Sequence, residues 1–302
     1  MTRRLKYQLE QPNGCFAATT DFFGGQIAQL LLFSLHFVSA LVMFITGADN
    51  NDGRVDIFVN DPVATNETMT KFDFSMNKPI GDLNLYYVNG VFLLWTAFFH
   101  GVYFAGYIVF NTNLSIRLRW IEYFSASLMA IIIMSLTGLR DVYLMLTIAA
   151  LIWTTMFFGY IQDIVFQVGL QRFFVVSPWL MGFVPFMSAW SIIVAHFYYI
   201  LDKDKDDVPR WVRSIVIILT LFYLSFAVVQ YAYIVRPRGL QPSPNREDRL
   251  TVFEKNYRAI SGLRNDQGKI NETMRQMDGA MHLLSLTSKL TLAWICFGGF
   301  SK

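Results

Sequence analysis

The sequence predicts an all-α membrane protein: a seven-transmembrane-helix bundle with a small extracellular β-hairpin in the first outer loop. Hydrophobic residues make up 54% of the 302 residues and charged residues only 16%, whereas a soluble domain carries about 25% charge. The apolar residues also gather in seven long blocks. The length of each block is close to the roughly 20 residues that a helix needs to cross about 30 Å of hydrocarbon. The abundant aromatic side chains (28 Phe, 14 Tyr, 7 Trp) suit the two membrane interfaces.

The seven blocks follow one another along the whole chain, so residues 1–302 form a single membrane domain without a visible repeat or second soluble domain. The expected spans cover about residues 22–46, 85–110, 114–136, 142–166, 179–201, 211–235 and 280–300. Boundaries set in this way can move by a few residues, but long apolar blocks fix the number of spans.

The distribution of Lys and Arg predicts the orientation of the bundle. Basic residues gather in the N-terminal tail (1–21), in the loop between the second and third spans, and in the loop 237–278. Cytoplasmic loops carry an excess of Lys and Arg, so these three segments are expected in the cytoplasm of a cell membrane. The segment 48–83, whose acids outnumber its bases, is then extracellular, as is the C-terminus.

Two loops are long enough to hold structure of their own. Around residues 55–59 and 72–76 hydrophobic side chains alternate with other residues, which predicts two short strands and hence an extracellular hairpin. Residues 250–263 are expected to form a short amphipathic helix on the cytoplasmic membrane surface.

Lys289 is the residue whose position most needs a chemical explanation. It lies near the middle of the seventh span, roughly 15 Å from either interface at 1.5 Å per residue. A charge at that depth is costly, and a lysine inside a membrane is a functional candidate by default. Burial favours the neutral amine, which attacks an aldehyde to form a Schiff base. A structural lysine paired with a buried acid explains the same position equally well.

Glu122 is the acid best placed to be the partner of Lys289. If the third helix begins near Leu114 and the chain enters the seventh from the same side, both side chains share a depth near the midplane. A protonated Schiff base is a cation and needs a counterion of this kind. The alternative is an interfacial belt in which Glu122 bonds to Arg119 one turn earlier.

Two motifs around these residues resemble a known family. The segment from Arg119 to Met129 resembles the third-helix signature of heliorhodopsins, and Ser285–Lys289 with Ala293–Trp294 resembles their seventh-helix motif. The start of the fifth helix, Pro178–Trp179 with Gly182 and Pro185, is also similar. Inverted topology and the outer hairpin agree with this resemblance. The long loop between the sixth and seventh helices departs from it and resembles a eukaryotic or viral branch.

The resemblance implies a role for each matching residue. Lys289 would hold all-trans retinal as a Schiff base, and Glu122 would be its counterion. Ser285 and Ser127 would form hydrogen bonds near the Schiff base, and Thr96 would stand where the family has a serine. His36 and His100, each mid-way through its span, would form a hydrated cluster that accepts the proton; two ordinary core histidines are the alternative. The polyene would lie among aromatic side chains that otherwise serve as ordinary bundle aromatics, namely Trp294, Trp179, Phe226 and Tyr223.

Three classes of function follow from these residues. The first is a photoreceptor in which light-driven isomerisation moves a proton locally and a cytoplasmic signalling partner reads the change. The second is a light-gated passive pathway for protons or cations, and the third is a carrier in which Lys289 and Glu122 form an ordinary ion pair. A dedicated pump is disfavoured, because no carboxylate follows Glu122 on the third helix and Ser285 stands where typical pumps carry a second carboxylate. The family resemblance also implies a homodimer in the lipid bilayer.

The sequence favours neither an enzyme nor a nucleic-acid-binding protein. No nucleophile–base triad, no metal-ligand cluster and no Gly-rich phosphate loop is visible. A net charge of +3 is too small to indicate a nucleic-acid partner.

Overall fold

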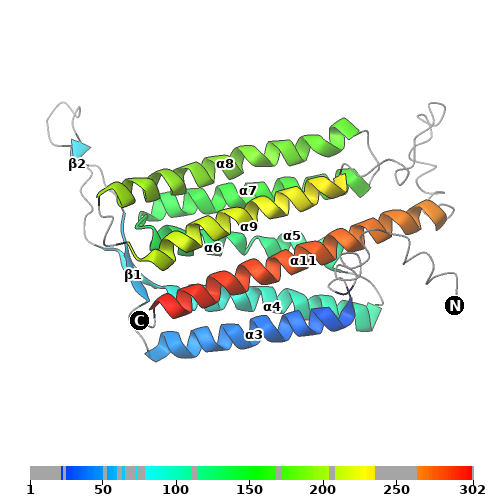
Figure 1. Cartoon of the computed structure of the whole chain (residues 1–302), viewed down its shortest axis with the longest axis horizontal. Coiled ribbons are helices and arrows are strands. Elements are labelled where there is room, and N and C mark those ends of the chain that lie inside the picture. The colour runs from blue at the N-terminus through cyan, green and yellow to red at the C-terminus, as the bar shows by residue number, and fades with distance from the viewer. Residues whose placement is uncertain are drawn as a thin grey trace.

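The computed structural model describes residues 22, 25–49, 53–59, 63–64, 72–73, 79–110, 114–167, 172–203, 208–234 and 264–300. Within these residues seven helical segments are long and apolar enough to cross a membrane, which confirms the predicted number. They run side by side along the long axis of the molecule (Figure 1). The predicted surface helix at 250–263 and the tail 1–21 lie outside the described residues.

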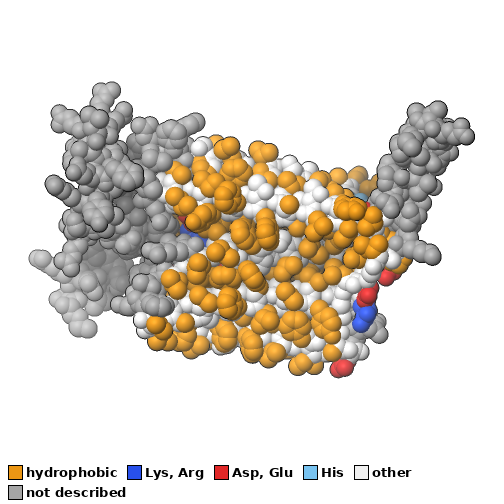
Figure 2. Space-filling view, turned by 180° about the vertical axis from the view of Figure 1, so that it is seen from behind, with side chains coloured by type: hydrophobic (Ala, Val, Ile, Leu, Met, Phe, Trp, Pro, Cys, Tyr) orange, Lys and Arg blue, Asp and Glu red, His pale blue; other side chains and the backbone are white. Residues whose placement is uncertain are grey.

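The first two spans are α3 (Gln26–Asp49) and α4 (Leu85–Phe110), which pack along each other. The third span consists of α5 (Ser115–Tyr123) and α6 (Ala126–Leu136). The remaining four spans lie in α7 (Val142–Gln167), α8 (Arg172–Lys203), α9 (Arg210–Ile234) and α11 (Arg264–Phe300). Hydrophobic side chains cover most of the described surface seen in Figure 2, as expected where helices face lipid, and the few charged groups in view lie toward its two ends.

The last helix differs most from the expectation. The sequence placed residues 237–278 in a loop and began the seventh span near residue 280. In the structure α11 already begins at Arg264, and its apolar span covers Gln276–Gly299. The boundary at 278 was therefore wrong, because the polar residues that precede the span continue the same helix instead of ending it. Asp278 consequently lies inside the bundle, fully buried.

The third span is interrupted at Phe124 and Ser125, directly after α5, the helix that contains Glu122. Both residues keep right-handed helical backbone angles, yet Ser125 N donates to Glu122 O at 3.1 Å, a bond to the third preceding residue. Such tighter bonding marks one turn of 3₁₀ type within an otherwise α-helical segment. The hydroxyl of Tyr223 on α9 donates to the carbonyl of Ala126 at 3.1 Å, so a neighbouring helix braces the interruption.

The hairpin between the first two spans is present, but its two predicted strands do not pair with each other. Strand β1 (Arg54–Ile57) pairs antiparallel with β4 (Gly81–Asn84), and β2 (Val63–Ala64) pairs with β3 (Phe72–Asp73). The second predicted strand at 72–76 thus exists at its start, but it pairs with β2 and not with β1. β1 lies at the end of the bundle where α11 finishes (Figure 1).

Asn84 joins this hairpin to the bundle. Its side-chain Oδ1 accepts hydrogen bonds from the backbone N–H groups of Tyr86 and Tyr87, and its Nδ2 donates to Gly47 O at 3.1 Å. An Asn that caps free N–H groups is a common start of a helix. The contact sets the beginning of α4, and α4 in turn carries Thr96, His100 and Tyr103 into the interior.

Candidate functional site

Lys289 lies buried in the bundle, where two oxygen atoms accept hydrogen bonds from its amine. Its Nζ is 2.8 Å from Glu122 Oε1 and 2.8 Å from Thr96 Oγ1. Thr96 Oγ1 in turn donates to Phe92 O at 3.2 Å, so its lone pairs face the amine. The structure thus brings Lys289, Glu122 and Thr96 together in one cluster, and the interfacial-belt alternative for Glu122 does not fit its complete burial.

Glu122 is held by two further donors besides the amine. The hydroxyl of Tyr103 donates to Glu122 Oε2 at 3.1 Å, and the hydroxyl of Ser285 donates to Oε1 at 3.4 Å. A buried carboxylate needs such bonds, because an ionised group without partners would be costly in a low-dielectric interior. Ser285 therefore lies beside the ion pair, and so does Tyr103, which the sequence pattern does not single out.

A largely apolar cavity begins at Lys289 and extends away from the polar cluster. It encloses about 950 Å³, including its open part. α5, α6, α7, α8, α9 and α11 all contribute to its wall. Trp179, Tyr223 and Phe226 line it as predicted, and Lys289, Ser285 and Ser288 form the polar end. Further aromatic lining residues are Phe92, Trp120, Tyr123, Phe158, Phe183, Phe186 and Phe222.

Two glycines allow close packing along this wall. A methyl group on Gly159 would lie 2.2 Å from the ring of Trp120, and one on Gly182 would lie 3.2 Å from Phe158 Cβ. A Cβ atom essentially never lies within 3 Å of another heavy atom to which it is not bonded, so α7 carries a glycine where Trp120 packs against it. Gly159 thereby fixes the ring that forms part of the cavity wall.

Two residues expected at this site lie elsewhere. Ser127 donates to Phe124 O at 2.8 Å and accepts from Trp153 Nε1 at 2.9 Å, so both of these hydrogen bonds go to partners other than Lys289 and Glu122. Trp294 is 44% exposed and packs edge-on against Phe297, and it is not among the residues that line the cavity. Both residues match positions of a family motif, but a position in the sequence gives only the depth along a helix. Successive residues are about 100° apart around an α-helix, so Trp294 can share the helix of Lys289 and still face outward.

The two predicted histidines lie together beside the ion pair. The rings of His36 and His100 stack with their centroids 5.4 Å apart. His36 Nδ1 bonds to Leu32 O at 2.8 Å and His100 Nδ1 to Gln29 Oε1 at 2.6 Å. Both acceptors require a proton on Nδ1, which leaves Nε2 of each neutral ring as a lone pair. Neither Nε2 has a hydrogen-bond partner within the described part of the chain.

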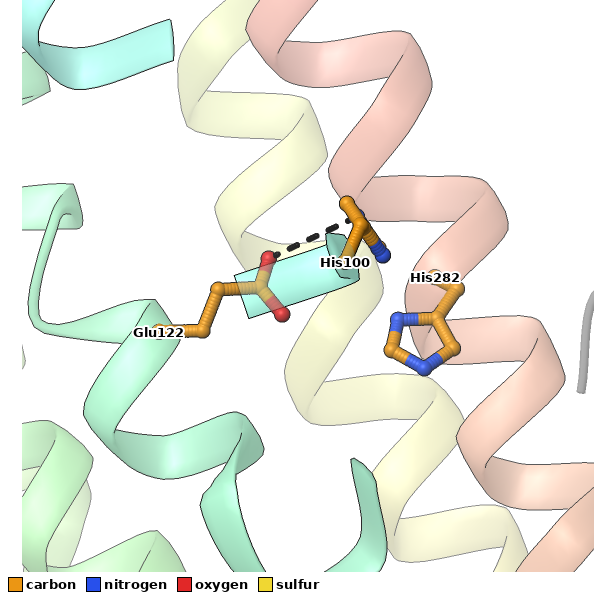
Figure 3. Close-up of side chains that lie close together, drawn as sticks. All are labelled: His100, Glu122 and His282. Carbon is orange, nitrogen blue, oxygen red and sulfur yellow. Dashed lines mark ion pairs between the residues drawn. The ribbon is translucent and has the colours of Figure 1, made fainter. Parts of the chain in front are cut away.

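A third histidine, His282, was missed by the sequence analysis. Its ring centroid is 5.2 Å from that of His100, and His100 Nε2 is 4.0 Å from Glu122 Oε1 (Figure 3). Ligand atoms of His100, Glu122 and His282 lie within 4.8 Å of one another, a group that could hold a metal ion. Lys289 already occupies the Glu122 oxygen nearest to His100, so we treat the three residues as a cluster of charges and proton sites.

A second ionic cluster lies beyond His282 and was not expected either. Arg119 bonds to Asp163 on α7 and to Asp278 on α11, and all three side chains are buried. Trp120 Nε1 donates to Asp163 Oδ2 at 2.6 Å, and Ser115 donates to Asp278. We name Arg119, Asp163 and Asp278 the arginine cluster. Asp163, an acid isolated in an apolar span, was the sequence signal that could have revealed it.

A comparison with protein-family models matches residues 26–236 to the family described as Heliorhodopsin. A search of curated proteins finds no match. The matched region contains α3 to α9, and therefore Glu122, both predicted histidines and most of the cavity wall, while α11 with Lys289 lies beyond it. The match covers more than two thirds of the chain, and the seven spans agree with it. The chain belongs to the heliorhodopsins, a family of light-sensing retinal proteins of the membrane.

Proposed function

We propose that this protein is a photoreceptor in which all-trans retinal is bound covalently to Lys289 and Glu122 is the counterion. The observation that carries the proposal is the position of the Lys289 amine: it ends a large aromatic cavity on one side and contacts a buried carboxylate on the other. An ordinary ion pair in a carrier explains the second contact but not the first.

The cavity suits a long, flat polyene. Its lining is mostly apolar and aromatic, with a few polar groups at the end formed by Lys289, as in sites that bind small molecules. Trp179 packs edge-on against Phe183 at 4.7 Å, and its indole N–H donates to Ala227 O at 3.1 Å, so the ring is fixed from α9. Such rigid rings restrict the bound shape of a ligand.

When bound, retinal absorbs visible light and isomerises, which disturbs the surroundings of the Lys289 nitrogen. In the structure, Glu122 Oε1 and Thr96 Oγ1 both accept hydrogen bonds from the free amine. A protonated Schiff base carries a single N–H, which we expect to donate to the ionised Glu122. His36 and His100, whose Nε2 lone pairs lack partners in the described structure, are the proposed acceptors of the proton after illumination. Ser285 and Tyr103 stabilise the charge left on Glu122.

The decisive test is a visible spectrum after all-trans retinal is added to the purified protein. We expect a visible band in the wild type, none in Lys289→Ala, and an unchanged band in Lys269→Ala, a control at the other end of α11. Glu122→Gln should shift the band or remove its protonated form, because the negative charge that balances the cation is lost. A colourless wild type, or a coloured Lys289→Ala, would refute the proposal.

A light-gated passive pathway for protons or cations is the second candidate, and the buried polar side chains favour it. From Lys289 they continue through His100 and His282 to Asp278 and Ser115, near the start of α5. Photocurrents in voltage-clamped cells separate the two functions. A current that reverses near the proton equilibrium potential supports conduction, and electrical silence supports a receptor.

We infer that the light-induced change reaches a cytoplasmic partner through α11, because this single helix carries both Lys289 and the segment from Arg264 that precedes the apolar span. This inference requires the N-terminus inside and the C-terminus outside, as the Lys and Arg distribution predicts. Protease accessibility in sealed vesicles tests that orientation. A homodimer through the helices and the outer hairpin is also proposed, and a single monomeric species in mild detergent would contradict it.

A further inference from the structure

The arginine cluster contains more negative than positive groups. Within the described residues, Arg119 is its one cation and Asp163 and Asp278 are its two acids. All are almost completely buried, and an unbalanced charge in such a place is costly. The negative charge of Glu122 does not add to this imbalance, because Lys289 neutralises it at a distance of 2.8 Å. One positive charge is therefore missing beside the two aspartates.

Both acids are held in a way that favours their ionised form. Asp163 accepts hydrogen bonds from Arg119 and from Trp120 Nε1, and Asp278 accepts from Arg119 and from Ser115 Oγ. Four donated bonds to two carboxylates, two of them from a cation, stabilise negative charge on each. A neutralising proton is thus better placed on a neighbouring base than on either carboxyl group.

His282 is that neighbouring base. Its Nε2 lies 3.4 Å from Asp278 Oδ2, one helical turn earlier on α11, and neither ring nitrogen forms a hydrogen bond within the described structure. His36 and His100 each bond through Nδ1 to a neutral oxygen, of Leu32 and Gln29. Among the described residues, the histidine pairs with a carboxylate are His100 with Glu122 and His282 with Asp278. His282 is thus the only one of these three rings that is paired with a carboxylate of the arginine cluster.

We propose that His282 binds a resident proton in the dark protein, as an imidazolium that balances the arginine cluster. The site takes a single proton and is distinct from the Lys289–Glu122 pair. The groups nearest His282 are His100 and Tyr103 on α4, Glu122 on α5 and Asp278 on its own helix α11. The next charged or titratable groups contact these: His36 on α3 stacks on His100, Lys289 bonds to Glu122, and Arg119 joins Asp278 to Asp163 on α7.

On the function proposed above, with retinal held by Lys289, a charged His282 also directs the path of the proton. An already charged His282 cannot take up the proton that leaves the Lys289 nitrogen, so the neutral His36–His100 pair becomes its destination. The imidazolium also stands near Glu122, as Figure 3 shows, and competes with Lys289 for its negative charge. The resting charge of His282 can nevertheless be measured without retinal.

Nitrogen-15 NMR of histidine-labelled protein in lipid nanodiscs, prepared without retinal at neutral pH, tests the proposal. The chain has four histidines, and we expect the signal of one imidazolium among them. That signal should vanish in His282→Gln and persist in His196→Gln, a matched control on α8. A wild type with only neutral rings, or an imidazolium that survives His282→Gln, would overturn the proposal.

Asp163→Asn separates charge balance from local pairing. In the described structure the ion pair of Asp163 is with Arg119 and that of His282 is with Asp278. Replacing Asp163 by Asn removes one negative charge and makes the arginine cluster neutral. The imidazolium signal should therefore also be lost in Asp163→Asn. Persistence of the signal in Asp163→Asn would refute the charge-balance argument. Should this variant fail to fold, infrared spectroscopy of the wild type provides the second measurement. A protonated carboxyl band in the dark that disappears in folded Asp278→Asn would place the proton on the acid and overturn the assignment to His282.

Discussion

The two sides of Lys289 are built on opposite principles. Toward α8 and α9 the wall is aromatic and its polar groups bond mainly to backbone carbonyls, as Trp179 and Tyr223 do. On the other side, toward α3 and α4, the interior holds three histidines, two ionic clusters and several hydroxyl groups. The first side selects a ligand by shape, and the second distributes charge. Lys289 is the residue that belongs to both.

The largest effect is expected from Arg119→Gln, which removes the cation of the charged side. Asp163 and Asp278 would then remain buried without their common partner, and breaking a buried ion pair in this way costs about 3–5 kcal/mol. The free energy of unfolding, measured by titration with denaturing detergent, checks this value. Arg54→Gln removes an ion pair that is about half exposed and should cost no more than about 1 kcal/mol. Equal losses in both variants would contradict the distinction.

Gly159→Ala tests the apolar side. The added methyl group would collide with the ring of Trp120, and overpacking of this kind costs about 1–3 kcal/mol. The visible band should also shift, because the ring forms part of the cavity wall. Gly298→Ala is the matched control, since its methyl group would meet no atom within 4 Å. An unchanged band in Gly159→Ala would show that the cavity wall adapts.

Tyr103→Phe removes one hydrogen bond from Glu122 and leaves the ring in place. The lost bond to an ionised group corresponds to about 1.5 kcal/mol. We expect a small band shift together with this loss of stability, because the charge on Glu122 is then stabilised less. Tyr143→Phe, at a residue that is 63% exposed, should change neither quantity. A Tyr103→Phe variant identical to the wild type would separate Tyr103 from the site.

The smallest effect is expected from Trp294→Phe. Its side chain faces outward, so neither the visible band nor the affinity for retinal should change, whereas Trp179→Phe should alter both. A large band shift in Trp294→Phe would place this ring against the polyene and restore the assignment that its sequence motif suggested.

The sequence predicted the number of spans, the hairpin and the ion pair because each depends on local pattern or on depth along a single helix. Thr96 and Ser285 lie at the ion pair, and Trp179, Tyr223 and Phe226 line the cavity. Ser127 and Trp294 do not, since depth is readable from a sequence position but the direction in which a side chain faces depends on how the helices pack.

The arginine cluster and His282 escaped the sequence analysis for a related reason. Asp278 was assigned to a loop, because the polar start of α11 resembles a linker more than a helix. Because α11 begins earlier, Asp278 and His282 lie one turn apart on the same helix. Arg119 on α5 then bonds to both α7 and α11. Contacts among three helices cannot be deduced from any one of them.

The interruption of the third span changes the directions in which its two halves face. A 3₁₀ turn advances about 120° per residue and an α-helix about 100°, so the turn at Phe124 and Ser125 rotates α6 relative to the face that an unbroken α-helix would present. Glu122, before the turn, thereby meets the amine of Lys289, while Ala126 and Met129, after it, line the cavity. An unbroken third helix would present these polar and apolar contacts at a different relative angle.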